Sequence, residues 1–407
     1  MTIDSDVVVV GGGPCGSFAA LNIAKRGASV TVFEEHNEVG VPSHCPGHLS
    51  IKGLKDLGLY PLPKGIVENT FVGAIFHSSK GKSFSVRFSS PVTCAVNRAL
   101  FDRHIARMAE DAGAHYQLNK RVESLIIDDN FAKGVIVRQG EREERFSAKL
   151  VVDAEGISSR LLRRTGLTQL SRSMVVNGVE AEIENVNDAE SDMVEVFLGK
   201  KYAPGFYAWL IPIGNGRAKV GLGANSGKPK EFLQKLMAEH PAASKKLGKA
   251  EVSKIAFHPI TLGGMIPKIY SNGFLAVGDV ASQVKPTTGG GVVLGLNCAK
   301  AAAETACTAF HESDFSSELL GTYQKKCREF LNFDLRFMLK ARKLLDSMSD
   351  EKLDQTVELC AKLGLEKTLQ SVSDVDFQGR SFLRILGSPR MLAVLGYFFY
   401  LFLSANP

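Results

Sequence analysis

The chain opens on an apolar run, a glycine-rich segment, a helical segment and a second apolar run. Val7–Val10 contains only valine, which is typical of a strand buried on both faces of a parallel sheet. After the glycines of segment 11–16, the small residues of Ser17–Arg26 favour a helix. The apolar run Ser29–Phe33 then ends at Glu34. This order predicts a β-α-β unit at the start of the chain.

Further apolar runs extend this first domain. An amphipathic helix is expected from about Asn97 to Gly113, and two or three strands are expected within 121–148. A separate buried strand is predicted at Leu150–Val152. Another is predicted at 274–279, followed by a helix that three glycines open. These pieces belong with the opening unit in one α/β domain.

The pattern changes between about residues 170 and 265, where apolar and polar residues alternate. Alternation of this kind predicts antiparallel strands, and the turn Gly214-Asn215-Gly216 is a strong hairpin signal. A further hairpin is expected around Ser78–Lys82. From about residue 315 the pattern is helical. We therefore predict α/β plus antiparallel β: a Rossmann-type domain, an inserted sheet domain and a helical C-terminal region.

Composition places the chain among ordinary globular proteins. Its 407 residues are too many for one compact core, so two domains are expected. The net charge of +6 is mild, which argues against nucleic acid and suits an anionic substrate, an acidic electron carrier or an anionic membrane. The seven cysteines contain no CxxC pair, which favours a reducing cytoplasm over a disulfide scaffold. The first residues do not fit the pattern of a signal peptide. No segment of the sequence reaches the length of about 20 apolar residues that a helix needs to span a bilayer.

The opening segment carries the first candidate chemistry, because its glycines fit the spacing G-x-G-x-x-G. Gly11 permits a tight turn, Gly13 permits close approach of a pyrophosphate, and Gly16 permits close helix–strand packing. The helix start would face the phosphates, and Glu34 lies at the strand tip where a carboxylate binds ribose hydroxyls. The segment predicts a dinucleotide site.

Later residues are candidates for the same site. Arg98 stands in the first turn of a predicted helix, where the helix dipole disfavours a cation, so an anionic partner such as a phosphate is indicated. A solvated arginine is the alternative. Asp279 follows a buried strand, and Gly289–Gly291 open the next helix, whose start would hold a phosphate or an electron-rich ring oxygen.

Two other segments allow a functional and a purely structural interpretation. Cys45 lies between His44 and His48 in a loop. It is either an incidental thiol or a thiol that lies against the cofactor. A third interpretation, in which Cys45 and both histidines bind a metal, is the least favoured. The strand with Tyr207 and the single tryptophan, Trp209, is either core packing or the wall of a cavity for an apolar ligand.

Two C-terminal segments are also ambiguous. A helix with basic residues from Lys325 to Lys343 is either a solvated face or a docking surface for a membrane or a carrier protein. Met391–Leu403 is apolar but too short to span a bilayer, so it is a core helix, a lid or an interfacial anchor.

Together, GGGPCG…VFE, the helix of Arg98, DAEGISSR and VGDVASQVKPTTGGG resemble the FAD-binding fold of para-hydroxybenzoate hydroxylase. Within that group the chain resembles the geranylgeranyl reductase family, and most closely its archaeal digeranylgeranylglycerophospholipid branch. Pro204-x-x-Tyr207-x-Trp209-x-Ile211-Pro212 fits the family motif PxxYxWxFP, with Ile211 in place of Phe. Cys45 falls where the family places a cysteine against the flavin, although Cys45-Pro46-Gly47-His48-Leu49-Ser50 departs from the usual C-A-E-G-L-S.

The resemblance implies FAD as cofactor and assigns site residues by position. With the residues of the glycine-rich segment, the implied FAD contacts are Gly11, Gly13, Cys15, Gly16, Glu34, Cys45, Pro46, His48, Arg98, Val122, Asp279, Gly290, Gly291 and Val292. Cys45, Tyr207 and Trp209 are the candidate catalytic residues, with the two aromatics lining an isoprenoid cavity. We expect an FAD-binding domain at 1–65, 91–165 and 266–310, a substrate domain at 66–90 and 166–265, and a helical region at 311–407.

The implied activity is reduction of isoprenoid double bonds in geranylgeranyl lipids. Hydride from reduced flavin and a proton would add to the two alkene carbons, while aromatic faces stabilise developing positive charge. Cys45, His48 and water are the candidate proton donors. Ferredoxin, NAD(P)H and a deazaflavin are the candidate electron donors, and peripheral contact with a membrane is expected. The alternatives are a flavin monooxygenase or halogenase, and a non-catalytic isoprenoid carrier.

Overall fold

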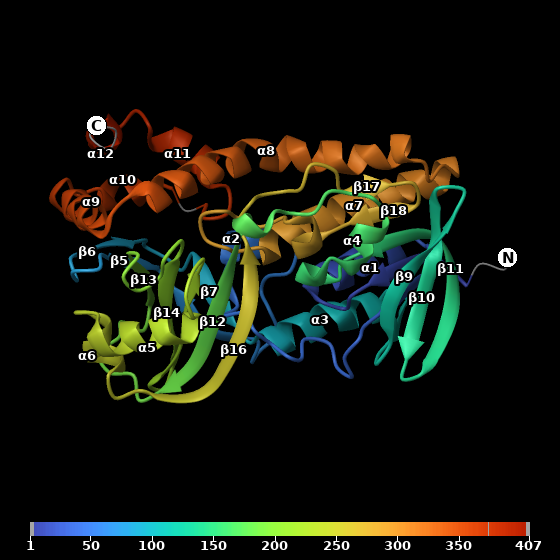
Figure 1. The fold of residues 1–407 in the computed structure, drawn as a ribbon, viewed down its shortest axis with the longest axis horizontal. Coiled ribbons are helices and arrows are strands. Elements are labelled where there is room, and N and C mark those ends of the chain that lie inside the picture. Colours follow the sequence, from blue (N-terminus) through green and yellow to red (C-terminus); the bar gives the residue numbers. More distant parts are fainter. Residues whose placement is uncertain (1–3, 373, 404–407) are drawn as a thin grey trace. The chain divides into compact units, whose positions relative to one another are not determined.

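The computed structural model describes residues 4–372 and 374–403, with side chains up to residue 397. Contacts gather the chain into two compact units. The first unit comprises Met1–Ser43, Arg98–Met174 and Thr261–Leu335, and the second comprises His44–Asn97, Val175–Ile260 and Arg336–Pro407. Figure 1 labels the elements of both units.

The first unit is an α/β layer built on one eight-stranded sheet in the order β17-β18-β11-β1-β2-β8, with β10 joined to β11 and β9 joined to β10. Its strands and α-helices are β1 (Ser5–Val10), α1 (Pro14–Ala24), β2 (Val30–Phe33), α3 (Arg98–Asp111), β8 (Ala114–Gln117), β9 (Arg121–Asp128), β10 (Phe131–Gln139), β11 (Arg142–Asp153), α4 (Arg160–Arg164), β17 (Tyr270–Ser271), β18 (Phe274–Ala276), α7 (Val292–Glu312) and the start of α8 (Ser317–Ser347). Short 3-10 turns lie at Gly156–Ser158, Arg172–Met174 and Gly278–Ala281.

The valine run forms β1, which pairs in parallel with β2 on one side and β11 on the other. Val7, Val8 and Val9 are fully buried, as a strand covered on both faces requires. The predicted break before Leu150 is wrong, because β11 is one continuous strand. Its polar half pairs with β10, and its apolar half enters the parallel sheet between β1 and β18.

The second unit holds a seven-stranded sheet in the order β16-β12-β15-β14-β13-β5-β6 and a three-stranded sheet in the order β3-β7-β4. Its strands and helices are β3 (His48–Ser50), α2 (Ile51–Asp56), β4 (Val67–Phe71), β5 (Gly73–His77), β6 (Ser83–Arg87), β7 (Thr93–Val96), β12 (Val175–Glu184), β13 (Met193–Leu198), β14 (Tyr207–Gly214), β15 (Arg217–Ala224), α5 (Pro229–Glu239), α6 (Ala243–Leu247), β16 (Glu251–Thr261), α9 (Asp350–Lys362), α10 (Glu366–Leu369), α11 (Gln378–Ile385) and α12 (Pro389–Leu403).

Both predicted hairpins are present, at β5–β6 and β14–β15. Two features differ from the sequence expectation. Helices α5 and α6 interrupt the run of strands, and β13 pairs in parallel with β5, which comes from a distant part of the chain.

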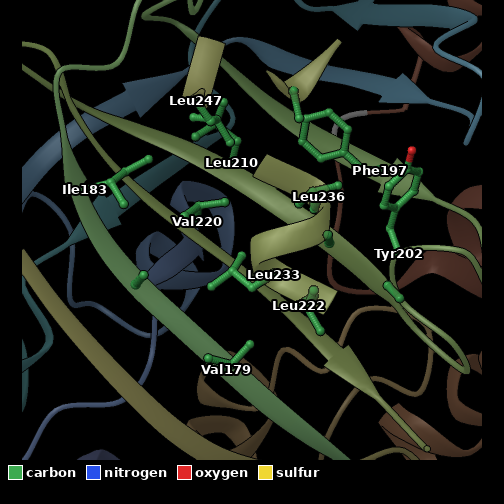
Figure 2. Close-up of a cluster of buried hydrophobic side chains, with 14 of the residues drawn as sticks. Val179, Ile183, Phe197, Tyr202, Leu210, Val220, Leu222, Leu233, Leu236 and Leu247 are labelled. Atoms are coloured by element: carbon green, nitrogen blue, oxygen red, sulfur yellow. The ribbon is translucent and has the colours of Figure 1, made fainter. Parts of the chain in front are cut away.

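One face of the large sheet packs against α5 and α6. Figure 2 shows this core, in which strand residues meet Leu233 and Leu236 of α5 and Leu247 of α6. Alternate residues of β12, β14 and β15 enter it, among them Val179, Leu210 and Val220. The residues between them therefore point to the opposite face of the sheet.

The C-terminal helices form a smaller core of their own. Met391 and Val394 of α12 pack with Ile385 of α11 and Cys360 of α9. None of the helices in the described part of the chain is long and apolar enough to cross a membrane. The predicted fold class, α/β plus antiparallel β with a helical C-terminal region, is confirmed.

Candidate FAD and substrate site

The turn after β1 is closed so tightly that two of its positions accept only glycine. Gly11 has φ +97°, and a Cβ there would lie 2.4 Å from the carbonyl oxygen of Ala154. A Cβ on Gly16 would lie 2.0 Å from the carbonyl oxygen of Gly11. Both obstacles are backbone atoms, which cannot rotate away. These two glycines therefore bring the start of α1 directly over the end of β1.

The start of α1 is left open toward a ligand. Gly13 is the N-cap and Pro14 is the first helical residue. No side chain caps the helix, and its first turn holds no acidic residue. A Cβ on Gly13 would meet no atom within 4 Å. Since the first N–H groups of a helix have no partner within it, this end suits a phosphate.

Glu34 lies at the end of β2 and turns back toward the glycine-rich segment. Its carboxylate accepts hydrogen bonds from the backbone N–H of Gly12 at 2.8 Å and from that of His36 at 2.9 Å. The backbone N–H of Lys120 donates to the carbonyl oxygen of Glu34 at 3.0 Å. Val122 follows two residues later, buried in β9. This part of the first unit therefore holds Gly12, Glu34 and the start of β9 together.

Asp279 and the start of α7 form a second glycine-led turn in the same unit. A Cβ on Gly291 would lie 2.9 Å from Oδ1 of Asp279, so the glycine leaves room for that carboxylate. Gly291 is the N-cap of α7, Val292 is its first residue, and no side chain caps it. Gly290 lies against Lys285, whose Cε would be 2.8 Å from a Cβ there.

Charged and thiol groups converge on these two turns. Arg98 donates two hydrogen bonds to Asp102, at 3.0 and 2.9 Å, which fixes the guanidinium on α3. Burial raises the pKa of Asp279, and Arg98 partly offsets that rise. Burial also raises the pKa of the Cys15 thiol, as does the charge of Asp279, so Cys15 stays a thiol. The structure thus brings Cys15, Arg98 and Asp279 near one another in the first unit.

Sequence reasoning missed the residues that support Asp279. The side-chain oxygen of Gln283 accepts from the backbone N–H of Gly278 at 2.7 Å, and its amide donates to Tyr323 Oη at 2.8 Å. Tyr323 in turn donates to the carbonyl oxygen of Ala276 at 2.9 Å. The local sequence offered one signal, a lone glutamine in a run of small and apolar residues. Its partner lies 40 residues later, on α8.

The loop of Cys45 belongs to the second unit, where a buried lysine holds it. Nζ of Lys219 on β15 donates to the carbonyl oxygen of Pro46 at 3.1 Å and pairs with Glu68 at 2.5 Å. His48 begins β3, and its Nε2 lies 2.7 Å from Oγ1 of Thr93. Lys219 therefore ties the segment beside Cys45 to the large sheet, a role that the sequence did not reveal.

The histidines beside Cys45 have other neighbours than a shared metal ligand set. Across the residues that the structure describes, no three His, Cys, Asp or Glu side chains gather as a metal site requires. His44 instead stacks on His258 of β16, with ring centroids 3.7 Å apart and an interplanar angle of 17°.

Tyr207 and Trp209 lie on the face of the sheet opposite α5. Their rings meet edge to face, with centroids 5.9 Å apart. Glycines on the neighbouring strand make room for the aromatic rings: a Cβ on Gly221 would lie 2.5 Å from the indole, and a Cβ on Gly223 would lie 2.7 Å from Phe206. Burial raises the pKa of Tyr207, so its hydroxyl stays protonated. The result is an aromatic surface beside two glycines of β15.

Comparisons with known proteins identify the family. The profile of the FAD-binding domain family matches residues 4–335. The digeranylgeranylglycerophospholipid reductase of Methanocaldococcus jannaschii is 34% identical over 87% of this chain and 90% of its own length. The digeranylgeranylglycerophospholipid reductase 2 of Methanopyrus kandleri is 33% identical over 88% of this chain and 90% of its own. The chain belongs to the digeranylgeranylglycerophospholipid reductase family.

Solved structures agree with this assignment. The geranylgeranyl bacteriochlorophyll reductase-like protein of Thermoplasma acidophilum has a TM-score of 0.85 at 25% identity, covering 97% of this chain and 99% of its own. A flavin-dependent brominase shares the fold, with a TM-score of 0.69 at 20% identity over 95% of this chain and 94% of its own. The resemblance predicted from the sequence motifs is confirmed.

FAD is the cofactor of this family member, and its residues fit that group. The open space at Gly13 and the uncapped start of α1 suit a pyrophosphate, while the Glu34 carboxylate suits ribose hydroxyls. The half-buried Asp279 carboxyl group beside the uncapped start of α7 suits the hydroxyls and the electron-rich oxygens of the remaining part of FAD. The contacts implied for the individual residues stay predictions.

Proposed function

We propose that this protein is an FAD-dependent reductase that saturates the isoprenoid double bonds of geranylgeranyl phospholipids. The observation that carries the proposal is the aromatic surface of β14, where Trp209 lies over Gly221 in a member of this family. A wall of this kind suits a long apolar chain, and the named relatives are reductases of a digeranylgeranyl lipid.

In such a reaction the aromatic side chains of this surface would stabilise positive charge on the substrate. FAD, when bound and reduced, supplies the hydride. An isolated alkene accepts hydride poorly unless a proton reaches its other carbon, which builds positive charge on the carbon skeleton. The faces of Tyr207 and Trp209 stabilise that charge by cation–π attraction of roughly 0.5–2 kcal/mol each. Cys45, Pro46 and His48 are proposed to contact the cofactor.

Trp209→Ala is expected to lower reductase turnover about 10-fold or more while FAD stays bound, since one cation–π contact of up to about 2 kcal/mol is lost. The assay uses purified, dithionite-reduced protein and a geranylgeranyl phospholipid, and mass spectrometry detects the gain of two hydrogen atoms per double bond. Phe257→Ala is the matched control, because Phe257 is an aromatic residue of the same sheet that is 56% exposed. Its turnover should equal that of the wild type.

Three results would contradict the proposal. Unchanged lipid mass with bound, reducible FAD would indicate a lipid carrier. Oxygen-coupled NAD(P)H oxidation without lipid reduction would indicate a monooxygenase or halogenase. Loss of FAD from Trp209→Ala would make this residue structural. Reduction of the bound FAD by ferredoxin, NAD(P)H or a deazaflavin, tested one at a time, identifies the electron donor.

We also propose that α11 and α12 contact an anionic membrane surface, where the lipid substrate resides. From Phe377 to Leu403 the chain has three arginines and no lysine, aspartate or glutamate. Leu383 is 53% exposed and Leu392 is 54% exposed, and Arg384 beside Leu383 is also exposed. Exposed leucines among cations complement a negatively charged lipid surface.

Arg384→Gln with Arg390→Gln is expected to weaken binding to phosphatidylglycerol vesicles about 10-fold or more, at roughly 1 kcal/mol per arginine. Co-sedimentation at fixed ionic strength measures the bound fraction. Arg142→Gln with Arg145→Gln removes the same charge from exposed positions of β11 and should leave binding unchanged. Equal weakening by both pairs would attribute binding to net charge and refute a local surface.

A further inference from the structure

A buried arginine lies at one end of the aromatic surface in the second unit. Arg342 belongs to the part of α8 that falls within this unit, and its side chain is only 9% exposed. The central carbon of its guanidinium group lies 5.1 Å from the centroid of the Phe206 ring. Its charge also acts on Tyr207: burial raises the pKa of Tyr207, and Arg342 partly offsets that rise.

The aromatic rings continue from this cation in a series. The centroids of Phe206 and Tyr207 are 4.4 Å apart, and those of Tyr207 and Trp209 are 5.9 Å apart. These three residues and Arg342 all belong to the second unit. The aromatic surface therefore has a charged end beside Phe206, and Trp209 lies at the other end of the series.

The guanidinium group has a fixed orientation and keeps one nitrogen for a ligand. Asp346, one turn later on α8, accepts hydrogen bonds from Nε, at 2.9 Å, and from Nη2. No residue in the described part of the chain accepts a hydrogen bond from Nη1. The Asp346 side chain is 40% exposed, so a ligand can reach this ion pair from solvent. In the first unit, Arg98 and Asp102 form the same pair beside the predicted FAD site.

A structural role alone does not account for a charge at this place. Burial of a guanidinium group costs free energy, and an apolar side chain of similar size would pack on Phe206 without that cost. A planar guanidinium group is well suited to bind phosphate oxygens, since its N–H groups match their geometry. A lipid with a phosphate group and a long apolar chain would complement both the cation and the rings.

We infer that Arg342 binds the phosphate group of the lipid substrate and thereby sets the direction in which the isoprenoid chain lies on the aromatic surface. The inference rests on the proposed function and deepens it. The phosphate group lies beside Phe206, and the chain passes Tyr207 toward Trp209. Arg342 is a specificity and positioning residue, and it transfers neither hydride nor proton.

The test compares the wild-type holoprotein with Arg342→Gln. The ligands, in neutral detergent, are a digeranylgeranyl glycerophospholipid and the digeranylgeranylglycerol that remains when its phosphate group is removed. Quenching of Trp209, the single tryptophan, measures the affinity for each lipid. Arg342→Gln is expected to weaken phospholipid binding about 10- to 100-fold, the usual effect of losing a hydrogen bond to a charged group. Its affinity for the phosphate-free lipid, and kcat for both lipids, should change less than about 3-fold.

Matched variants separate the charge from the fold. Arg336→Gln removes an exposed arginine from the same helix and should leave both affinities unchanged. Arg342→Lys keeps the charge without the planar group and should restore part of the phospholipid affinity. Inorganic phosphate should compete far more weakly than the phospholipid does, because it has no apolar chain to bind the rings.

The outcomes separate this inference from the proposed function. An equal loss of both affinities in Arg342→Gln would make Arg342 a structural support of Phe206 and refute the inference. Unchanged phospholipid affinity would refute it as well, and equally strong competition by inorganic phosphate would overturn the assignment to a lipid. Selective phospholipid binding that depends on Arg342, without reduction of any double bond, would support the inference and refute the proposed function.

Discussion

Gly13→Ala is expected to weaken FAD binding about 10- to 100-fold and to leave the melting temperature of the FAD-free protein unchanged. Gly13 has φ −65°, which alanine adopts without strain, and its Cβ would meet no protein atom within 4 Å. The added methyl group would instead occupy space that the pyrophosphate needs at the start of α1. Overpacking of this kind costs about 1–3 kcal/mol. Equilibrium titration of the apoprotein with FAD measures the dissociation constant.

Two matched variants distinguish loss of the cofactor from loss of the fold. Gly387→Ala, which also meets no atom within 4 Å, should change neither FAD affinity nor melting temperature. Gly16→Ala should lower both, because its Cβ would collide with the Gly11 backbone at 2.0 Å. Wild-type FAD affinity in Gly13→Ala would show that the pyrophosphate does not approach this glycine.

The second unit is expected to lose about 2–3 kcal/mol of unfolding free energy between pH 6.5 and pH 4, because His240 is held neutral. Its Nδ1 accepts hydrogen bonds from the backbone N–H groups of Ala242 and Ala243, so the proton lies on Nε2, which donates to the Ser78 carbonyl oxygen. Burial lowers the pKa of His240 to about 4 from an ordinary 6.5. The unfolded chain therefore binds the proton first, and the stability present above pH 6.5 declines as pH falls toward 4.

Urea unfolding followed by Trp209 fluorescence reports on the unit that contains His240. In His240→Asn, whose amide oxygen can still accept from the backbone, the loss between pH 6.5 and 4 should disappear. His115→Asn changes an exposed histidine and should keep the wild-type slope. Glu195 affects only the acid end of this range. Burial alone would raise the pKa of Glu195, but His77 and Lys246 lower it overall, so its contribution to stability declines as the pH falls below about 4.5, and the slopes are compared above that pH. An unchanged slope in His240→Asn would refute the assignment.

Local pattern predicted the parts of the site that depend on backbone geometry. Gly11 is required by its positive φ in the turn and Gly16 by its close approach to the Gly11 carbonyl oxygen, and both requirements arise within one strand–turn–helix that is continuous in the chain. The buried strand before Asp279 and the glycines before α7 were recognisable for the same reason. By contrast, β11 could not be recognised as one strand, because its first half is polar and its second half is apolar. The difference arises because the first half pairs with β10 and the second half pairs with β1.

Supporting residues could not be predicted, because their partners are distant in the chain. Gln283 and Tyr323 act together only where α8 passes the turn of Asp279. Lys219 reaches Pro46 across 173 residues. Arg342 is one of several basic residues of α8 until packing sets its guanidinium group over Phe206. Each depends on a pairing that local composition does not encode.

By itself, the sequence determined the cofactor class and the family, because glycine spacing, strand tips and the aromatic motif are short-range features with strict backbone requirements. The tertiary structure alone decided which distant groups meet: Arg342 with Phe206, and Lys219 with the loop of Cys45. The physical reason is the packing of segments that are far apart in the chain. Side chains alternate between the two faces of a sheet, so strand register and the helix that packs on a strand decide which groups share a face.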